Sequence, residues 1–205
     1  MELDHRDSII FIEVMQPVRV VLIVVFGYLM GSILFADIIA RLRGVNIWKV
    51  GSGNPGAANV FREVGKLEGI IVWVLDAAKA AIPMLIADRV LRLPYFWVGM
   101  TGIAAFVGHC WPIWYKLKGG KGAATASGVF LYLLPRVFPF GVAAFFILQR
   151  VGPRSGKKML ITFVVMMAII FGLYYREWRW LLPFILIFMV IGFVANIDVL
   201  REVRL

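Results

Sequence analysis

The chain has little charge and almost no cysteine. Of its 205 residues only 17% are Asp, Glu, Lys or Arg, whereas 61% are hydrophobic and the mean hydropathy is +0.87. One soluble core of this length would not use so much apolar surface. The single cysteine, Cys110, excludes an intramolecular disulfide and a zinc cluster built on several thiolates. The composition therefore indicates an integral membrane protein.

Regular alternation of polar and apolar residues is also missing. Transmembrane β-barrels are built from strands of about ten residues that alternate in this way. The apolar runs here are instead continuous and about as long as a membrane-spanning helix. No internal repeat or separate soluble segment interrupts them. We therefore expect an all-α integral membrane protein, a compact bundle of transmembrane helices that forms a single domain over residues 1–205.

Seven spans are predicted, at 18–42, 69–91, 95–117, 122–135, 138–149, 160–174 and 181–197. The fourth and fifth are short, and merging them into one helix would leave six. With the N-terminus outside, seven spans put about twice as many Lys and Arg inside as outside, whereas six give no bias. The positive-inside rule thus favours seven helices and a cytoplasmic C-terminus. Residues 1–17 lack the basic start of a cleaved signal peptide and read as an amphipathic or loose lead-in.

The net charge of +10 would suggest nucleic-acid binding in a soluble chain. Here the Lys and Arg residues gather at the ends of apolar spans. Membrane topology and anionic lipid headgroups account for that placement. We therefore expect membrane lipids as partners and no nucleic acid.

Two polar stretches rich in glycine interrupt the apolar sequence. The first glycine-rich stretch is GSGNPGAAN at 51–59, and the second is KLKGGKGAAT at 116–125. Glycine frees backbone amides to face an anion and lysine adds positive charge, so both are candidate phosphate cradles on the cytoplasmic side. In the first stretch we expect the three glycine amides to turn towards one point. Its candidate donors are Gly51, Ser52, Gly53, Asn54, Gly56, Asn59 and the following Arg62.

The second stretch places lysines beside glycines and the start of the next helix. Its candidate residues are Lys118, Gly119, Gly120, Lys121, Gly122 and Thr125. It is not a Walker loop, because Tyr115 occupies the place of the first required glycine and Gly122 follows Lys121. The G-x-G-x-x-G pattern at 51–56 has no preceding strand, so a dinucleotide fold is not indicated either. The alternative for both stretches is structural: loop-forming residues and basic topology signals at an interface.

Three polar residues fall inside predicted spans. Asp76 and Lys79 are three residues apart, so they share a helix face and can neutralise each other. This pair is either structural or part of an anion pathway. His109 lies near the cytoplasmic end of the third span, where it either orients the neighbouring loop or moves protons.

These residues together resemble the bacterial acyl-phosphate-dependent glycerol-3-phosphate acyltransferases, a family of small seven-helix inner-membrane enzymes. The resemblance rests on Gly31 and Ser32, both glycine-rich stretches, LDAAK at 75–79, and the Gly-His pair before Pro112. It covers about residues 20–135 and is thin beyond them. It implies transfer of a fatty acyl group from acyl phosphate to the primary hydroxyl of glycerol 3-phosphate, which gives 1-acyl-glycerol 3-phosphate and phosphate in phospholipid synthesis. It implies neither a cofactor nor a metal.

The resemblance also implies roles for residues at a site that faces the cytoplasm. The catalytic set is Ser52, Arg62, Lys121 and Asn196. The set that binds acyl phosphate and glycerol 3-phosphate is Gly51, Gly53, Asn54, Gly56, Asn59, Lys118, Gly119, Gly120, Gly122, Thr125, His109 and Ser155.

The chain departs from the family pattern at several positions. Phe193 stands where the family typically has a histidine, three residues before Asn196, and Trp48 stands where it has an arginine. The loop at 150–158 matches the family's serine motif only through Ser155, and the acidic ending is missing. These departures leave open a catalytically weakened or acceptor-altered relative that binds lipid or phosphate. The polar residues inside spans, Asp76 and Lys79, leave open a small anion transporter.

Overall fold

The computed structural model describes residues 5–136, 138–139 and 182–195, and every regular element in these ranges is helical. The all-α class predicted from the sequence is thus confirmed for the described residues. By compactness the chain divides into a first unit, Met1–Val129, and a second unit, Phe130–Leu205. Each unit is described by itself, and the single domain over 1–205 stays a prediction.

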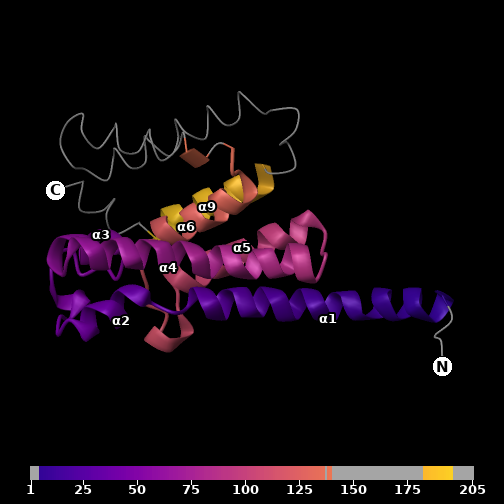
Figure 1. Cartoon of the computed structure of the whole chain (residues 1–205), viewed down its shortest axis with the longest axis horizontal. Helices are drawn as coiled ribbons and strands as arrows, with labels where there is room; N and C mark the ends of the chain where they lie inside the picture. The colour runs from indigo at the N-terminus through magenta and orange to yellow at the C-terminus, as the bar shows by residue number, and fades with distance from the viewer. Residues whose placement is uncertain (1–4, 137, 140–181, 196–205) are drawn as a thin grey trace. The chain divides into compact units, whose positions relative to one another are not determined.

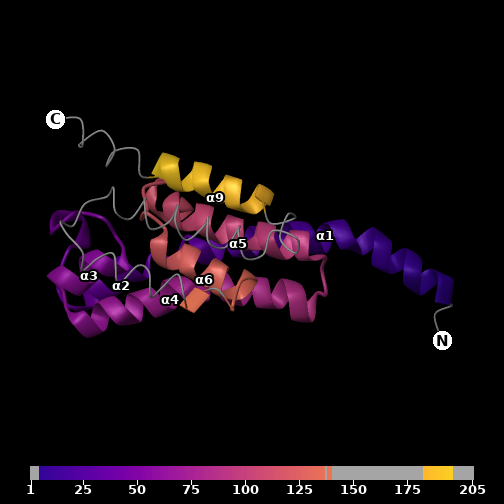
Figure 2. The same ribbon diagram turned by 90° about the horizontal axis from the view of Figure 1, so that it is seen from above.

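The first unit consists of long apolar helices with short ones at one end. Its elements are α1 (His5–Gly31), α2 (Phe35–Leu42), η1 (Ile47–Lys49), α3 (Ala57–Glu63), α4 (Lys66–Leu85), η2 (Ile86–Val90), α5 (Tyr95–Cys110), η3 (Ile113–Tyr115) and the beginning of α6 (Ala123–Leu133). Figures 1 and 2 both show α2 and α3 beside the same end of α4. The first glycine-rich stretch lies at this end, where it follows η1 and runs into α3, and the second follows η3 and runs into α6.

The first predicted span is not one helix. It was expected at 18–42, but α1 begins at His5, continues through Pro17, and ends at Gly31 before α2 starts. Ser32 closes the end of α1, since its amide and its hydroxyl both donate to the Tyr28 carbonyl, at 2.9 and 2.8 Å. The break leaves the Ile33 carbonyl free of the helix, and it accepts a 2.6 Å hydrogen bond from Lys79 on α4.

Helices α1 and α5 approach closely because small residues line their contact. A Cβ at Gly31 would collide with the Ala105 backbone, and one at Gly27 would lie 2.7 Å from the Thr101 carbonyl oxygen. Glycine at such positions lets helix backbones meet, a common arrangement in membrane proteins. The Tyr28 hydroxyl also donates to the Trp111 carbonyl at 2.9 Å. The end of α5 is thereby fixed against the break after α1.

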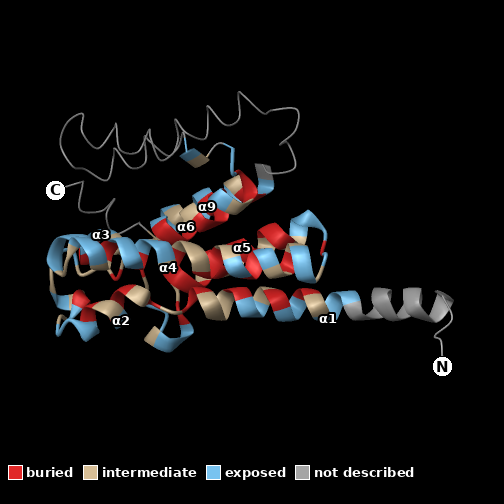
Figure 3. Cartoon of the chain, in the orientation of Figure 1, coloured by how far each residue is buried: buried red, intermediate tan, exposed pale blue. Residues whose placement is uncertain are grey.

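Three segments of the described chain are long and apolar enough to cross a membrane: Gln16–Leu42, Lys66–Val90 and Tyr95–Tyr115. Large apolar side chains on them face outward, among them Val21 at 60% and Leu22 at 64% exposure (Figure 3). Such surface suits lipid rather than water. Two shorter apolar helices, Ala123–Leu133 and Pro183–Ala195, fall within the fourth and seventh predicted spans. Nearly all of the fifth predicted span and the whole of the sixth lie outside the described residues, which stop at 139 and resume at 182. The count of seven therefore stays a prediction.

The second unit is described at the end of α6 and in α9 (Leu182–Ala195). The rings of Phe130 and Phe188 lie 5.4 Å apart, and both side chains are buried. Phe193, in contrast, is 55% exposed on α9. Two predicted site residues, Ser155 and Asn196, lie outside the described residues.

The close contact between α1 and α5 makes Gly31→Ala destabilising. The added methyl group meets the Ala105 backbone, and overpacking of this kind costs about 1–3 kcal/mol. Thermal unfolding of the detergent-purified protein should show a lower midpoint than wild type. Val21→Ala, on the exposed face of the same helix, is the control and should leave the midpoint nearly unchanged. Equal midpoints for the two variants would contradict this account of the contact.

Candidate functional site

The first glycine-rich stretch is held in shape by one buried asparagine. Asn59 is 1% exposed, and its Oδ1 accepts a hydrogen bond from the Ser52 amide at 3.1 Å. Its Nδ2 donates to the carbonyls of Ile47 at 3.4 Å and Val50 at 3.1 Å. The Asn59 side chain is thus used inside the loop, where it ties α3 to the segment that follows η1.

The glycines of this stretch form turns rather than a ring of converging amides. Gly51 and Gly53 have φ of 54° and 64°, a region that residues with side chains seldom occupy. The Gly53 amide donates to the Val50 carbonyl at 3.0 Å, and the Gly56 amide donates to the Asn54 carbonyl at 2.9 Å. The expectation that the glycine amides face one point is therefore wrong for Gly53 and Gly56.

Three polar side chains of this segment remain at the surface. Ser52 and Arg62 are exposed and Asn54 is half-buried. They are the members of the predicted set that the loop presents outward. A hydroxyl, a carboxamide and a guanidinium can all donate hydrogen bonds to phosphate oxygens.

The second glycine-rich stretch begins with an unusual turn. Lys116 and Leu117 have φ of 52° and 60°, a left-handed conformation that costs a non-glycine residue about 1–2 kcal/mol. The turn is held by the Leu117 amide, which donates to the Pro112 carbonyl at 3.1 Å. The Gly120 amide then donates to the His109 carbonyl at 3.0 Å. The stretch therefore folds back over the end of α5.

The two stretches meet at Gly120. A Cβ there would lie 3.0 Å from the Pro55 carbonyl oxygen and would collide with the His109 ring. Only glycine fits this crossing, so residues far apart in sequence come together over His109. Two lysines flank Gly120 in the sequence: Lys118 is exposed and Lys121 is half-buried.

The second stretch leads directly into α6. The Gly122 carbonyl accepts from the Ala126 amide at 2.7 Å, which closes the first turn of the helix. Thr125 in this turn is fully buried, and no described residue makes a hydrogen bond with its Oγ1. The unpaired amides of a helix N-terminus, with lysines nearby, favour an anion.

The predicted pair Asp76 and Lys79 is confirmed, and it extends to His109. All three residues are at most 2% exposed. Lys79 Nζ lies 2.7 Å from Asp76 Oδ1 and 2.9 Å from His109 Nδ1. The charged pair on α4 is therefore connected to α5 through His109, whose ring lies at the crossing of the two stretches.

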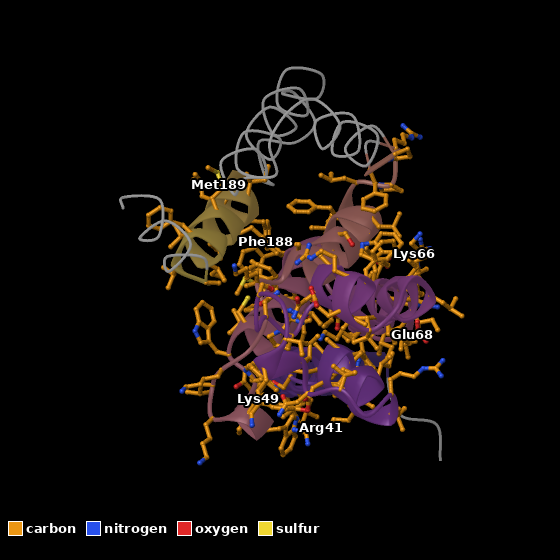
Figure 4. All side chains as sticks on the ribbon, turned by 90° about the vertical axis from the view of Figure 1, so that its left-hand side faces the viewer. Arg41, Lys49, Lys66, Glu68, Phe188 and Met189 are labelled. Atoms are coloured by element: carbon orange, nitrogen blue, oxygen red, sulfur yellow. The ribbon has the colours of Figure 1, made fainter. Side chains whose placement is uncertain are left out.

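A second cluster, around Asp37, was not predicted from the sequence. Asp37 is 2% exposed and accepts from Arg41 Nε at 2.8 Å, Trp48 Nε1 at 2.9 Å and Tyr115 Oη at 3.0 Å. It therefore joins the segments that lead into both glycine-rich stretches. A signal was available, since an acidic residue inside a predicted span is expensive unless it is paired. Figure 4 looks onto this end of the first unit, with Arg41 and Lys49 labelled.

Comparison with known proteins places these features in one family. A family profile described as glycerol-3-phosphate acyltransferase matches residues 21–202. The glycerol-3-phosphate acyltransferase of Anaeromyxobacter dehalogenans (strain 2CP-1 / ATCC BAA-258) is 53% identical over 118 residues, which are 56% of this chain and 59% of the relative. That of Aquifex aeolicus (strain VF5) is 44% identical over 122 residues, 60% of this chain and 64% of the relative. The chain thus spans less than two thirds of the length of these relatives.

Two solved structures are similar over a longer range. Both are crystal structures of PlsY (YgiH), an integral membrane glycerol 3-phosphate acyltransferase, in its glycerol 3-phosphate form and its lysophosphatidic acid form. Each is 34% identical and covers 90% of this chain and 89% of its own, with TM-scores of 0.74 and 0.72 respectively.

The start of α6 allows a matched test of the second stretch. Gly122 and Gly44 have similar φ, 78° and 72°, but a Cβ at Gly122 would collide with the Phe106 ring, whereas one at Gly44 meets nothing within 4 Å. Alanine at either position pays the same backbone strain, about 1–2 kcal/mol. Gly122→Ala should lose about 1–3 kcal/mol more through overpacking. Thermal unfolding in detergent compares the two, and an equal loss would show that the Phe106 contact does not limit residue 122.

Proposed function

The chain belongs to the glycerol-3-phosphate acyltransferase family, and we propose that it transfers a fatty acyl group from an acyl phosphate to the primary hydroxyl of glycerol 3-phosphate. The products are 1-acyl-glycerol 3-phosphate and inorganic phosphate, in phospholipid synthesis. The observation that carries the proposal is the crossing at Gly120 and Pro55, which joins two glycine-rich stretches and the lysines of the second. Both substrates carry phosphate, and one has an acyl chain that belongs in lipid.

The proposed setting is the inner membrane of a bacterium. The protein is a multi-pass membrane protein, with apolar helices and a solved integral-membrane relative. We extend this to seven spans, an outer N-terminus, a cytoplasmic C-terminus and a site that faces the cytoplasm. The excess of Lys and Arg on the inner side supports this orientation.

The proposed reaction needs little covalent chemistry from the protein. The hydroxyl oxygen of glycerol 3-phosphate attacks the acyl carbonyl carbon, and the bond from that carbon to the phosphate oxygen breaks. A phosphate oxygen of the acyl phosphate accepts the hydroxyl proton, and phosphate leaves. Because acyl phosphate is already activated, the protein mainly positions the two substrates and neutralises charge.

The proposed roles follow from exposure and bonding. Lys121 stabilises charge on the carbonyl oxygen and the leaving phosphate, with Lys118 beside it in sequence. Ser52 and Arg62, exposed on the first stretch, bind a phosphate group. Asn59 contributes indirectly, because its side-chain oxygen accepts a hydrogen bond from the Ser52 amide and so fixes the backbone there. The resemblance also assigns roles to Asn196 and Ser155, which lie outside the described residues.

One observation favours a second candidate function, an acceptor-altered relative. Trp48 stands where the family has an arginine, and its Nε1 already donates to Asp37. It therefore offers neither a charge nor a free donor to a phosphate. The anion transporter loses its support, since Lys79 is held by Asp76, Ile33 and His109 rather than left facing a pathway.

Phosphate release from acyl phosphate by the purified protein separates these functions. Release that requires glycerol 3-phosphate supports the acyltransferase. Tight binding of acyl phosphate or glycerol 3-phosphate without release supports the altered relative. Flux into liposomes without chemistry supports transport. A parallel assay with acyl-CoA tests the donor class, and equal rates with the two donors would overturn the assignment of acyl phosphate.

Lys121→Ala should nearly silence turnover while the protein stays folded. Loss of one donor to developing negative charge costs about 10²- to 10³-fold in rate. The control is Lys66→Ala, an exposed lysine at the start of α4 outside both stretches, which should keep turnover near wild type. The phosphate-release assay and the thermal midpoint are measured for both variants. Near wild-type turnover by Lys121→Ala would remove Lys121 from the catalytic set.

Phe193→His should raise turnover with glycerol 3-phosphate. The substitution restores the imidazole that the family typically has at this position, where Phe193 has no hydrogen-bonding group. Phe193 is 55% exposed on α9. Val190→His, at a 63% exposed position of the same helix, controls for a general effect of histidine. An unchanged or lower rate in Phe193→His would show that residue 193 does not limit this chain.

A further inference from the structure

We propose that Lys79 and Asp76 fix the proton of His109 on Nε2, so that this buried imidazole donates a hydrogen bond to a phosphate oxygen of the substrate through the opening that Gly120 leaves. The inference rests on the proposed function and adds to it. Lys79 and Asp76 are then positioning residues, and His109 contacts the anion as a neutral donor.

The first step is the use of the three ammonium protons. A lysine ammonium has three N–H donors and no acceptor. Lys79 Nζ lies 2.6 Å from the Ile33 carbonyl oxygen, 2.7 Å from Asp76 Oδ1 and 2.9 Å from His109 Nδ1. The ammonium therefore has two hydrogen-bond acceptors, in Ile33 and His109, and an ion-pair partner in Asp76, and the side chain is 1% exposed.

The second step is the tautomer of His109. Because the ammonium donates to Nδ1, that nitrogen must carry a lone pair, and a neutral imidazole then has its proton on Nε2. Asp76 already balances the charge of Lys79, so a neutral ring leaves the buried group without net charge.

The third step is the direction of Nε2. A Cβ on Gly120 would collide with this atom and would lie 3.0 Å from the Pro55 carbonyl oxygen. The Nε2 proton thus faces the crossing of the two stretches, beside a residue that has no side chain. No described residue accepts a hydrogen bond from Nε2.

His109 is 2% exposed as a residue, yet its Nε2 has no acceptor among the described residues, so a ligand that reaches this atom can supply one. The surroundings identify its chemistry. Lys118 and Lys121 flank Gly120 in sequence, and the N-terminus of α6 follows. These groups favour an anion with exposed oxygens, and phosphate is the anion that both proposed substrates share.

Nitrogen-15 NMR of labelled histidine in nanodiscs tests the tautomer without any turnover. The chain has two histidines, so His5→Gln removes the other signal and serves as the background. We expect an unprotonated Nδ1 and a protonated Nε2. Glycerol 3-phosphate should shift the Nε2 signal, and inorganic phosphate added alone tests whether the phosphate group suffices. A protonated Nδ1, or an Nε2 signal that neither compound moves, would overturn the proposal.

The double variant Asp76→Leu with Lys79→Met tests the positioning residues. It removes both charges together, so no unpaired charge stays buried. We expect the Nδ1-protonated form of His109 to appear and the apparent affinity for glycerol 3-phosphate to fall. An unchanged tautomer in a folded double variant would show that Lys79 does not set it.

Two substitutions at His109 separate donation from packing. The side-chain nitrogen of His109→Gln can reach the position of Nε2, whereas that of His109→Asn reaches only the position of Nδ1. His109→Asn should raise the KM for glycerol 3-phosphate about ten- to a hundredfold, as expected for a lost hydrogen bond to a charged group. His109→Gln should recover much of this, and equal KM values would contradict donation from Nε2. Because the NMR test needs no catalysis, absence of phosphate release in wild type would count against the proposed reaction and not against the tautomer.

Discussion

The ammonium of Lys79 is the point on which the first unit depends. One buried nitrogen contacts the break between α1 and α2 through Ile33, its own helix through Asp76, and the end of α5 through His109. A buried charge is tolerated only when its partners satisfy it, so the positions of these three partners are strongly coupled. The carbonyl of Ile33 is available only because α1 ends at Gly31. The helix break and the buried pair therefore require each other.

Close helix packing makes this arrangement possible. A Cβ at Gly108 would collide with the Tyr28 carbonyl oxygen, one at Gly31 with the Ala105 backbone, and one at Gly128 with the Ala77 carbonyl oxygen. These contacts bring α5 against α1 and the start of α6 against α4. Without them a lysine on α4 would not reach acceptors on two neighbouring elements. The glycines within the helices thus allow two helices to approach closely. Gly51, Gly53 and Gly122 instead adopt a positive φ, which residues with side chains seldom occupy.

The sequence predicts the features that repeat or stand out along the chain, and it fails where distant segments decide. Apolar runs give the helical class, and the spacing of Asp76 and Lys79 gives their pairing. The helix break at 32–34, in contrast, is tied to the hydrogen bond from Lys79 to the Ile33 carbonyl, and no local sequence pattern predicts that contact. The amides of Gly53 and Gly56 close turns because Asn59 holds their loop against Val50, a contact that the motif does not reveal. Asp37 was missed for a similar reason, since two of its three partners, Trp48 and Tyr115, are distant in sequence.

Trp48, which replaces an arginine of the family pattern, removes a charge near the first glycine-rich stretch but leaves the contacts of Asp37 intact. Asp37 remains satisfied, because Trp48 and Tyr115 each donate one hydrogen bond and Arg41, one turn later on α2, supplies the charge. The segments leading into both glycine-rich stretches therefore keep their anchor without a guanidinium at position 48. An anion bound there would rely more on Lys118, Lys121 and neutral donors, which attract phosphate with less geometric selectivity than a forked guanidinium. A neutral donor at His109 has the opposite property, because its direction is fixed by buried partners. The backbone and the buried network can thus preserve the fold of both glycine-rich stretches while exposed side chains around them change.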